Sequence, residues 1–116
     1  QGTGKKVGGN KFGAKRVVLD GIDFDSTKEA GRYMELKMLQ RAKLIKDLKL
    51  QQVYLLIEKS ETERKCEYKA DFVYTLVETG ETVVEDVKSS ATRKLSTYIM
   101  KRKLMLSIHG IKIKEV

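Results

Sequence analysis

The segment of residues 66–88, CEYKADFVYTLVETGETVVEDVK, decides the fold. Its first half has apolar side chains at every second position, which is the period of a β-strand with one buried face. A turn-like stretch, Glu78-Thr79-Gly80-Glu81, separates this strand from a second one over residues 82–88. We therefore predict an antiparallel hairpin whose buried face is formed by Cys66, Tyr68, Ala70, Phe72 and Tyr74.

The register of this hairpin sets which polar side chains meet. Asp86 and Lys88 are two residues apart, so they point to the same face, with Val87 turned inward. If Thr79-Gly80 is a two-residue loop, Asp71 faces Lys88 and Val73 faces Asp86, all on one face. A three-residue loop with a bulge at Gly80 would shift the pairing by one residue.

Two carboxylates and a lysine at this spacing suit metal-dependent cleavage of a phosphodiester. Asp71 and Asp86 would hold a hard divalent cation in an open site. The ammonium of Lys88 could orient the attacking water and offset charge on the phosphate. An ordinary half-exposed hairpin with an Asp-Lys cross-strand pair has the same pattern, so the wider context must decide.

The composition indicates one globular domain. The chain has 116 residues, of which 41% are hydrophobic and 34% charged, which fits a single core over residues 14–116. One cysteine and one histidine exclude an intrachain disulfide and most zinc sites. Without an apolar run of about 20 residues or a signal-peptide pattern, we expect a soluble, cytoplasmic protein. Residues 1–13 should be a flexible glycine-lysine segment, with Gln1–Gly4 a tag remnant.

The charge distribution points to a polyanionic partner. The net charge is +8. Residues 89–116 carry seven basic side chains against the single acid Glu115, whereas residues 26–88 carry twelve of each sign. A basic segment directly after Lys88 would suit a nucleic-acid phosphodiesterase, because phosphate contacts dominate DNA affinity. A solvated helix face would have the same composition.

The other elements complete the order hairpin, helix, three strands, helix, strand. Asp20-Gly21 predicts a two-residue turn between strands at 17–19 and 22–24. Ser26 predicts a helix cap, with Glu29 completing a capping box, and the helix extends to about Lys43. Hydrophobic periodicity also predicts strands over 48–58 and 111–115. It predicts a second helix from Ser90 or Thr92 to about Ile108. Their expected core positions are Ala30, Tyr33, Met34, Met38, Leu39, Leu95, Tyr98, Ile99, Met105 and Leu106.

This order, with an aspartate on the second strand and an acid-x-lysine on the third, resembles the PD-(D/E)XK nuclease superfamily from about residue 22 to the end. More closely, the motifs look like a family of phage and prophage endonucleases, long labelled only as a domain of unknown function. That family is similar to archaeal-type Holliday junction resolvases and to the endonuclease subunit of heteromeric bacterial transposases. The motifs are FDS at 24–26 with Glu29-Ala30, Leu50-Gln51, YKADF at 68–72, VEDVK at 84–88, and KRKLM at 101–105 with Gly110-Ile111.

The resemblance implies a restriction-endonuclease-like core of the α/β (α+β) class, with a mixed central sheet flanked by helices. It implies that Asp71 and Asp86 hold Mg²⁺ or Mn²⁺, with the main-chain carbonyl of Val87 completing the coordination, and that Lys88 is the catalytic lysine. Glu29 matches the acid on the first helix, for which capping is the alternative role. Lys94, Tyr98, Lys101 and Arg102 are the candidate DNA contacts.

Two departures from the family pattern concern the acids. Alanine instead of proline precedes Asp71, and Asp86 replaces the more frequent glutamate, which leaves Glu85 as a rival on the opposite face. The resulting expectation is a Mg²⁺-dependent endonuclease of branched DNA, homodimeric, encoded by a phage or prophage and acting in the bacterial cytoplasm. The alternatives are a nuclease of linear or single-stranded DNA, and a non-catalytic DNA-binding accessory protein on the same fold.

Overall fold

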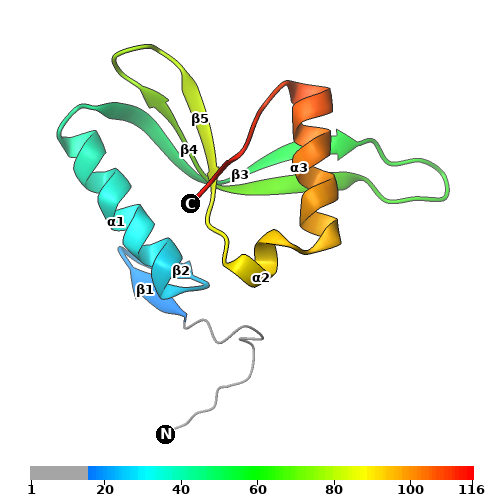
Figure 1. Cartoon of the computed structure of the whole chain (residues 1–116), viewed down its shortest axis with the longest axis horizontal. Coiled ribbons are helices and arrows are strands. Elements are labelled where there is room, and N and C mark those ends of the chain that lie inside the picture. Colours follow the sequence, from blue (N-terminus) through cyan, green and yellow to red (C-terminus); the bar gives the residue numbers. More distant parts are fainter. Residues whose placement is uncertain (1–15) are drawn as a thin grey trace, which may run out of the picture.

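A computed structural model describes residues 16–116, so the predictions for residues 1–13 lie outside the described residues. Two short strands precede a helix, a long hairpin and a third strand, and two helices and a final strand close the chain (Figure 1). None of the helices in this part of the chain combines the length and hydrophobicity needed to cross a membrane. The elements are β1 (Val17–Leu19), β2 (Ile22–Phe24), α1 (Thr27–Arg41), β3 (Ile45–Ile57), β4 (Cys66–Leu76), β5 (Thr82–Asp86), α2 (Ser90–Arg93), α3 (Ser96–His109) and β6 (Lys114–Glu115).

The central sheet is mixed, which confirms the predicted α+β class. Within residues 16–116 its strand order is β3-β4-β5-β6, and β1 and β2 form a separate hairpin. β4 pairs antiparallel with both β3 and β5, whereas β5 and β6 are parallel. Since a parallel pair needs a crossover connection, α2 and α3 between β5 and β6 supply it.

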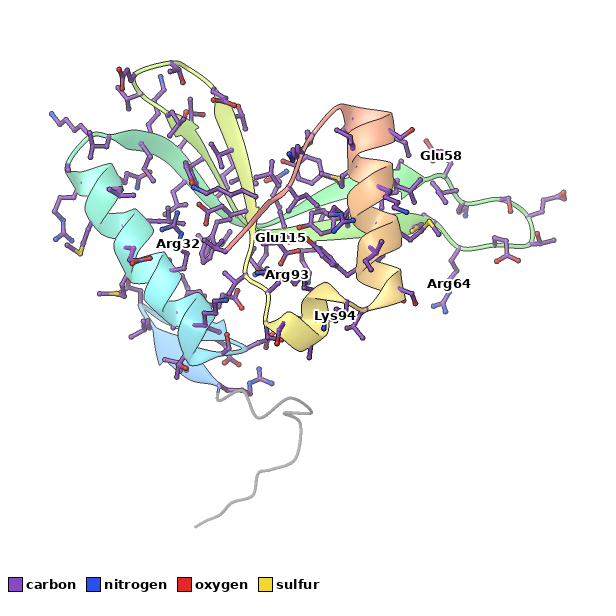
Figure 2. The ribbon with its side chains drawn as sticks, viewed as in Figure 1. Arg32, Glu58, Arg64, Arg93, Lys94 and Glu115 are labelled. Atoms are coloured by element: carbon purple, nitrogen blue, oxygen red, sulfur yellow. The ribbon has the colours of Figure 1, made fainter. Side chains whose placement is uncertain are left out.

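The β3–β4 hairpin carries both main helices. α1 lies over its end near β5, and α3 lies over its far half, toward the loop where Glu58 and Arg64 are found (Figures 1 and 2). Two clusters of buried side chains in the described part of the chain follow this division. The α1 cluster contains Phe24, Ala30, Tyr33, Leu36, Ile45, Phe72 and Tyr74. The α3 cluster contains Leu56, Tyr68, Ala70, Val73, Val84, Tyr98, Met105 and Ile113.

The start of the described chain forms as predicted. Leu19 pairs with Ile22 across Asp20 and Gly21, whose φ angles of 53° and 75° match a tight hairpin turn. Ser26 caps α1, since its hydroxyl accepts the Glu29 amide at 3.1 Å.

The β4–β5 turn differs from the predicted one. Leu76 donates its amide to the Glu81 carbonyl at 2.8 Å, and Thr75 pairs with Thr82. Residues 77–80 therefore form the loop, and Gly80 takes the left-handed conformation at φ 76°. Neither the two-residue loop nor the three-residue loop considered from the sequence forms. Because the observed register differs from that of the two-residue loop by two residues, each side chain keeps its face but has a different partner.

The predicted single helix after β5 is also wrong, because it is broken into α2 and α3 at Lys94 and Leu95. Ser89, not Ser90 or Thr92, is the N-cap, and it forms a capping box with Thr92. Four predicted core residues are exposed, since Met34, Met38, Leu95 and Leu106 have exposed fractions of 48%, 64%, 46% and 55%. Leu36, which the pattern missed, is fully buried in the α1 cluster.

Candidate active site

Asp71 and Asp86 lie opposite each other on adjacent antiparallel strands. The ladder pairs Phe72 with Glu85, and its continuation by one residue sets Asp71 against Asp86. Asp71 Oδ2 accepts the Val87 amide at 2.8 Å, just beyond the end of β5. The structure thus brings the two acids together more directly than the register of a two-residue loop, which would set Asp71 against Lys88.

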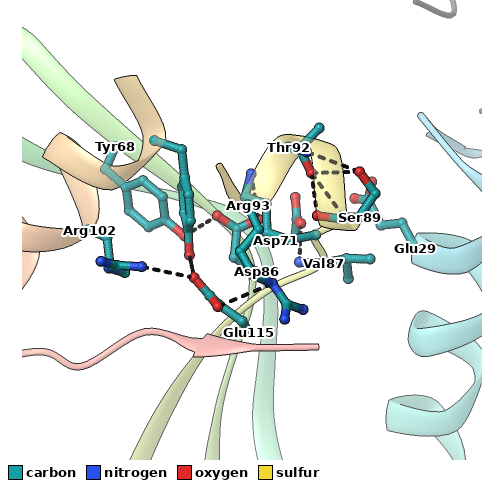
Figure 3. A network of polar contacts seen from close by, with 12 residues as sticks. Glu29, Tyr68, Asp71, Asp86, Val87, Ser89, Thr92, Arg93, Arg102 and Glu115 are labelled. Atoms are coloured by element: carbon teal, nitrogen blue, oxygen red, sulfur yellow. Dashed lines mark hydrogen bonds and ion pairs between the residues drawn. The ribbon is translucent and has the colours of Figure 1, made fainter. Parts of the chain in front are cut away.

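Asp86 is almost fully buried and is held by two side chains. The Tyr68 hydroxyl donates to Asp86 Oδ2 at 2.5 Å, and the Lys88 Nζ lies 3.3 Å from Asp86 Oδ1. The Lys88 ammonium also lies 4.4 Å from the centre of the Tyr98 ring, a cation-π distance. Figure 3 shows Tyr68 and Asp86 between α3 and α2. The predicted neighbourhood of Asp86 and Lys88 is therefore present.

Asp71 lies close to two other acidic side chains, Asp86 and Glu29. Its burial, then the hydrogen bond and charge of Asp86 and the charge of Glu29, raise the pKa of Asp71 to about 8. The Val87 amide acts in the opposite direction by stabilising the carboxylate. At neutral pH without a cation, Asp71 therefore retains its proton to a large extent.

Glu29 approaches the pair from the first turn of α1. Its exposed fraction is 7%, and burial followed by the charges of Asp25 and Asp86 raises the pKa of Glu29. Its carboxylate accepts a hydrogen bond from Gln51 Nε2 at 3.3 Å. The Ser26 hydroxyl accepts the hydrogen of the Glu29 amide, but within residues 16–116 the Ser26 amide donates no return bond to the Glu29 carboxylate. A capping box with Ser26 therefore does not explain the position of the Glu29 carboxylate.

Glu85 points to the other face, as predicted. It is fully buried beside Arg32, whose Nε and Nη2 donate to the two carboxylate oxygens at 2.8 Å and 2.6 Å. The Tyr74 hydroxyl donates to the same carboxylate. Burial alone would raise the pKa of Glu85, but the hydrogen bonds from Arg32 and Tyr74 outweigh it and lower the pKa. Glu85 therefore links α1 to the sheet and does not compete with Asp86.

The predicted DNA contacts divide into surface and buried groups. Lys94 is exposed at the end of α2, and Lys101 and Arg102 are half-buried on α3. Tyr98 has an exposed fraction of only 7%, and its hydroxyl donates to Glu115 Oε2 at 2.5 Å. Its ring lies against Lys88, and the role of Tyr98 as a DNA contact stays a prediction.

The acids suit a divalent cation in kind, because carboxylate oxygens are the ligands that Mg²⁺ and Mn²⁺ prefer. Asp71 and Asp86 are adjacent, and no ion pair within residues 16–116 neutralises Asp71. No group of three His, Cys, Asp or Glu side chains in this range is arranged to hold an ion. The fit therefore rests on the aspartate pair, and the roles of Glu29 and the Val87 carbonyl as ligands stay predictions.

Comparison with known families matches residues 9–114 to the family described as "Protein of unknown function (DUF1064)". The chain belongs to this family. No curated protein and no solved structure matches the chain. The DUF1064 match includes Glu29, Asp71, Asp86 and Lys88, so the candidate site lies within the region that defines the family.

Three residues of this DUF1064 site were not predicted as site residues. The sequence predicts Tyr68 only as a core residue. Its possible role at the site could have been inferred from its hydroxyl, because a buried tyrosine hydroxyl needs a hydrogen-bond partner. Glu115 contacts Tyr98 and also Arg93 and Arg102, with nitrogen-oxygen distances of 3.4 Å and 3.6 Å. The sequence feature that could have identified Glu115 is that it is the single acid of the basic C-terminal segment. Gln51 was noted only as part of a motif.

Proposed function

We propose that the chain is a metal-dependent DNA endonuclease that hydrolyses phosphodiester bonds and leaves a 5′-phosphate. The observation that carries this proposal is the opposition of Asp71 and Asp86, with the Lys88 ammonium 3.3 Å from Asp86. Two facing carboxylates, one of them buried, repel each other when both are charged, so the pair must either share a proton or bind a cation. A structural role would be better served by an oppositely charged pair, as Arg32 and Glu85 form on the other face.

The chain's own groups have separable roles in this reaction. Asp71 and Asp86, with Glu29 nearby, would hold Mg²⁺ or Mn²⁺, which lowers the pKa of water and offsets phosphate charge when bound. Tyr68 fixes the orientation of Asp86 from the core side, and the Val87 amide fixes Asp71. Lys88 is positioned to orient the attacking water and to face the developing negative charge. The Tyr98 ring limits where its ammonium can lie.

The basic C-terminal segment supports DNA as the substrate. Arg102, Lys103 and Lys112 line a hollow beside α3 and β6, together with Leu106, Ile113 and Glu115. Arg93 and Lys94 lie at the end of α2, the short helix that follows Lys88 (Figure 2). A backbone phosphate contacting this surface would lead the strand toward Asp71 and Asp86.

The branched substrate and the assembly follow from the resemblance to junction resolvases. We propose four-way junctions as the preferred DNA and a homodimer as the active form, because a junction is resolved by two paired cuts and two-fold symmetry supplies them. The same resemblance supports a phage or prophage origin and action in the bacterial cytoplasm.

The decisive experiment incubates the protein with a four-way junction, a linear duplex and a single strand, with Mg²⁺ or with EDTA. We expect Mg²⁺-dependent cleavage, fastest on the junction, and a loss of at least about 100-fold in Asp86→Asn with DNA binding retained. Glu81→Gln is the matched control, because it removes one exposed carboxylate next to the β4–β5 loop. Cleavage in EDTA, or an active Asp86→Asn protein, would refute the proposal. Binding without cleavage would indicate the accessory protein, and preference for another DNA would change the substrate.

A further inference from the structure

Gln51 has an unusual backbone conformation in the middle of β3. Its φ angle is 55°, in the left-handed region that non-glycine residues rarely adopt. The ladder pairs Leu50 with Phe72 and Gln52 with Ala70, so Gln51 is the residue opposite Asp71, and this pair is missing from the ladder. Such a conformation persists only where the surroundings impose it, and it is often found at functional sites.

A β-bulge does not explain this conformation. Asp47, also in β3, has a φ angle of 57°, and there the register shifts between Lys46–Thr75 and Lys49–Val73. Asp47 thus lies at an extra residue of the ladder. On either side of Gln51 the register is unchanged, because one residue of β3 still faces one residue of β4. The conformation of Gln51 therefore accommodates no insertion.

The side chain of Gln51 contacts Glu29, the acid that α1 contributes to the site. Its Nε2 donates to Glu29 Oε2 at 3.3 Å, across the space between β3 and α1. Glu29 is nearly buried, and the Ser26 amide does not donate to its carboxylate. Without Gln51 that capping geometry would be open to Glu29, because the serine and the spacing of a capping box are both present.

We propose that Gln51 is a positioning residue that acts through Glu29. Its left-handed backbone directs the carboxamide toward α1, and the carboxamide holds the Glu29 carboxylate on the side of Asp71 and Asp86. This inference rests on the proposed function in one respect, namely that these acids form a cation site. Partners that orient ligands in this way typically change metal affinity by 10- to 100-fold when they are removed.

The test uses Gln51→Gly, because glycine adopts a φ of 55° without strain and removes only the side chain. Direct Mn²⁺ binding to the full chain is measured by electron paramagnetic resonance, and metal-free stability by thermal unfolding. We expect Gln51→Gly to unfold at the same or a higher temperature and to bind Mn²⁺ about 10-fold more weakly. Asp47→Gly, which relieves the same strain elsewhere in β3, should bind Mn²⁺ as the unaltered chain does.

A double-mutant cycle with Glu29→Gln tests the route of the effect. If Gln51 acts through Glu29, adding Gln51→Gly to Glu29→Gln weakens Mn²⁺ binding no further. Unchanged binding in Gln51→Gly, or an equal loss in both backgrounds, would overturn the inference. If Gln51→Gly does not fold, Gln51→Asn replaces it, since asparagine tolerates this backbone but is one methylene shorter.

The binding readout separates this inference from the proposed function. If the unaltered chain binds Mn²⁺ but cleaves no DNA, the nuclease proposal fails while the role of Gln51 is still decided by the variants. If the unaltered chain binds no Mn²⁺, the cation site is absent and both proposals fail.

Discussion

At the scale of single residues, Asp71 and Asp86 have unequal surroundings. Asp86 has a hydroxyl donor from Tyr68 and the nearby ammonium of Lys88, so its charge is compensated within the protein. Asp71 has one backbone donor, the Val87 amide, and faces other acids. Asp71 is therefore the acid whose charge most needs an external cation, and its protonation should respond to both pH and metal.

The first prediction concerns Asp71→Asn without metal. Unfolding lowers the Asp71 pKa from about 8 to near its ordinary 3.8, so between these values the folded state binds more protons. The free energy of unfolding of the unaltered chain should thus decrease as pH rises through this window. Asp71→Asn has no carboxyl to titrate at this position, so its free energy of unfolding does not decrease in this way. It should exceed that of the unaltered chain by about 1 to 3 kcal/mol at pH 8, with little difference near pH 4.

Urea unfolding in EDTA at several pH values measures this effect, with Glu78→Gln in the exposed β4–β5 turn as the control. Mn²⁺ at pH 8 should stabilise the unaltered chain but not Asp71→Asn. A stability difference that does not change with pH would contradict the raised pKa of Asp71.

At the scale of elements, the β3–β4 hairpin organises the site. Its end near β5 packs on α1 and its far half packs on α3, and Ala70 and Phe72, on either side of Asp71, belong to different clusters. Asp71 and Gln51 therefore lie where the hairpin passes from one helix to the other. This transition brings Glu29 from α1 and Lys88 from the segment after β5 to the same place.

The sequence predicted the element order and the acids better than their pairing. Alternating apolar residues identified β4, and the capping serine located α1, because these signals are local. The register of β4 and β5 depends on a loop that Thr79-Gly80 alone does not determine, since Gly80 also suits the last position of a longer turn. The exposure of Met34 and Leu95 and the left-handed Gln51 depend on tertiary packing, which periodicity cannot show.

The second prediction concerns the link between α1 and β5. Arg32→Met leaves the fully buried Glu85 without its bidentate partner, since Lys114 is 4.0 Å away and largely exposed. Breaking a buried pair in this way should cost about 3 to 5 kcal/mol of unfolding free energy. Glu35→Ala removes the exposed partner of Arg32 at 3.2 Å and should cost less than about 0.5 kcal/mol. Denaturant unfolding measures the stability of both variants. Equal losses of unfolding free energy in Arg32→Met and Glu35→Ala would show that the Arg32–Glu85 pair does not link α1 to β5.

At the scale of the whole molecule, the position of the basic residues matters more than their total. The net charge of +8 would attract any polyanion. The C-terminal segment places its cations around α2, α3 and β6, and β6 pairs directly with β5 beside Asp86. The loop between β3 and β4 also carries exposed cations, Lys59 and Arg64. Arg64 lies toward the far end of this hairpin, away from Glu115 (Figure 2). The two surfaces allow location and total charge to be tested separately.

The third prediction compares two double variants with the same change in charge. Lys101→Ala with Arg102→Ala removes two cations from α3, and Lys59→Ala with Arg64→Ala removes two from the hairpin tip. If DNA approaches the acids over α3, the first pair should weaken binding and reduce the slope of log affinity against log salt by about 1 to 2. The second pair should leave the slope nearly unchanged. Because Arg102 already contacts Glu115 at 3.6 Å, the reduction in slope should be nearer the lower value.

Fluorescence anisotropy in EDTA at several salt concentrations measures both slopes without cleavage. Equal slopes in the two variants would mean that net charge, not the α3 surface, governs binding.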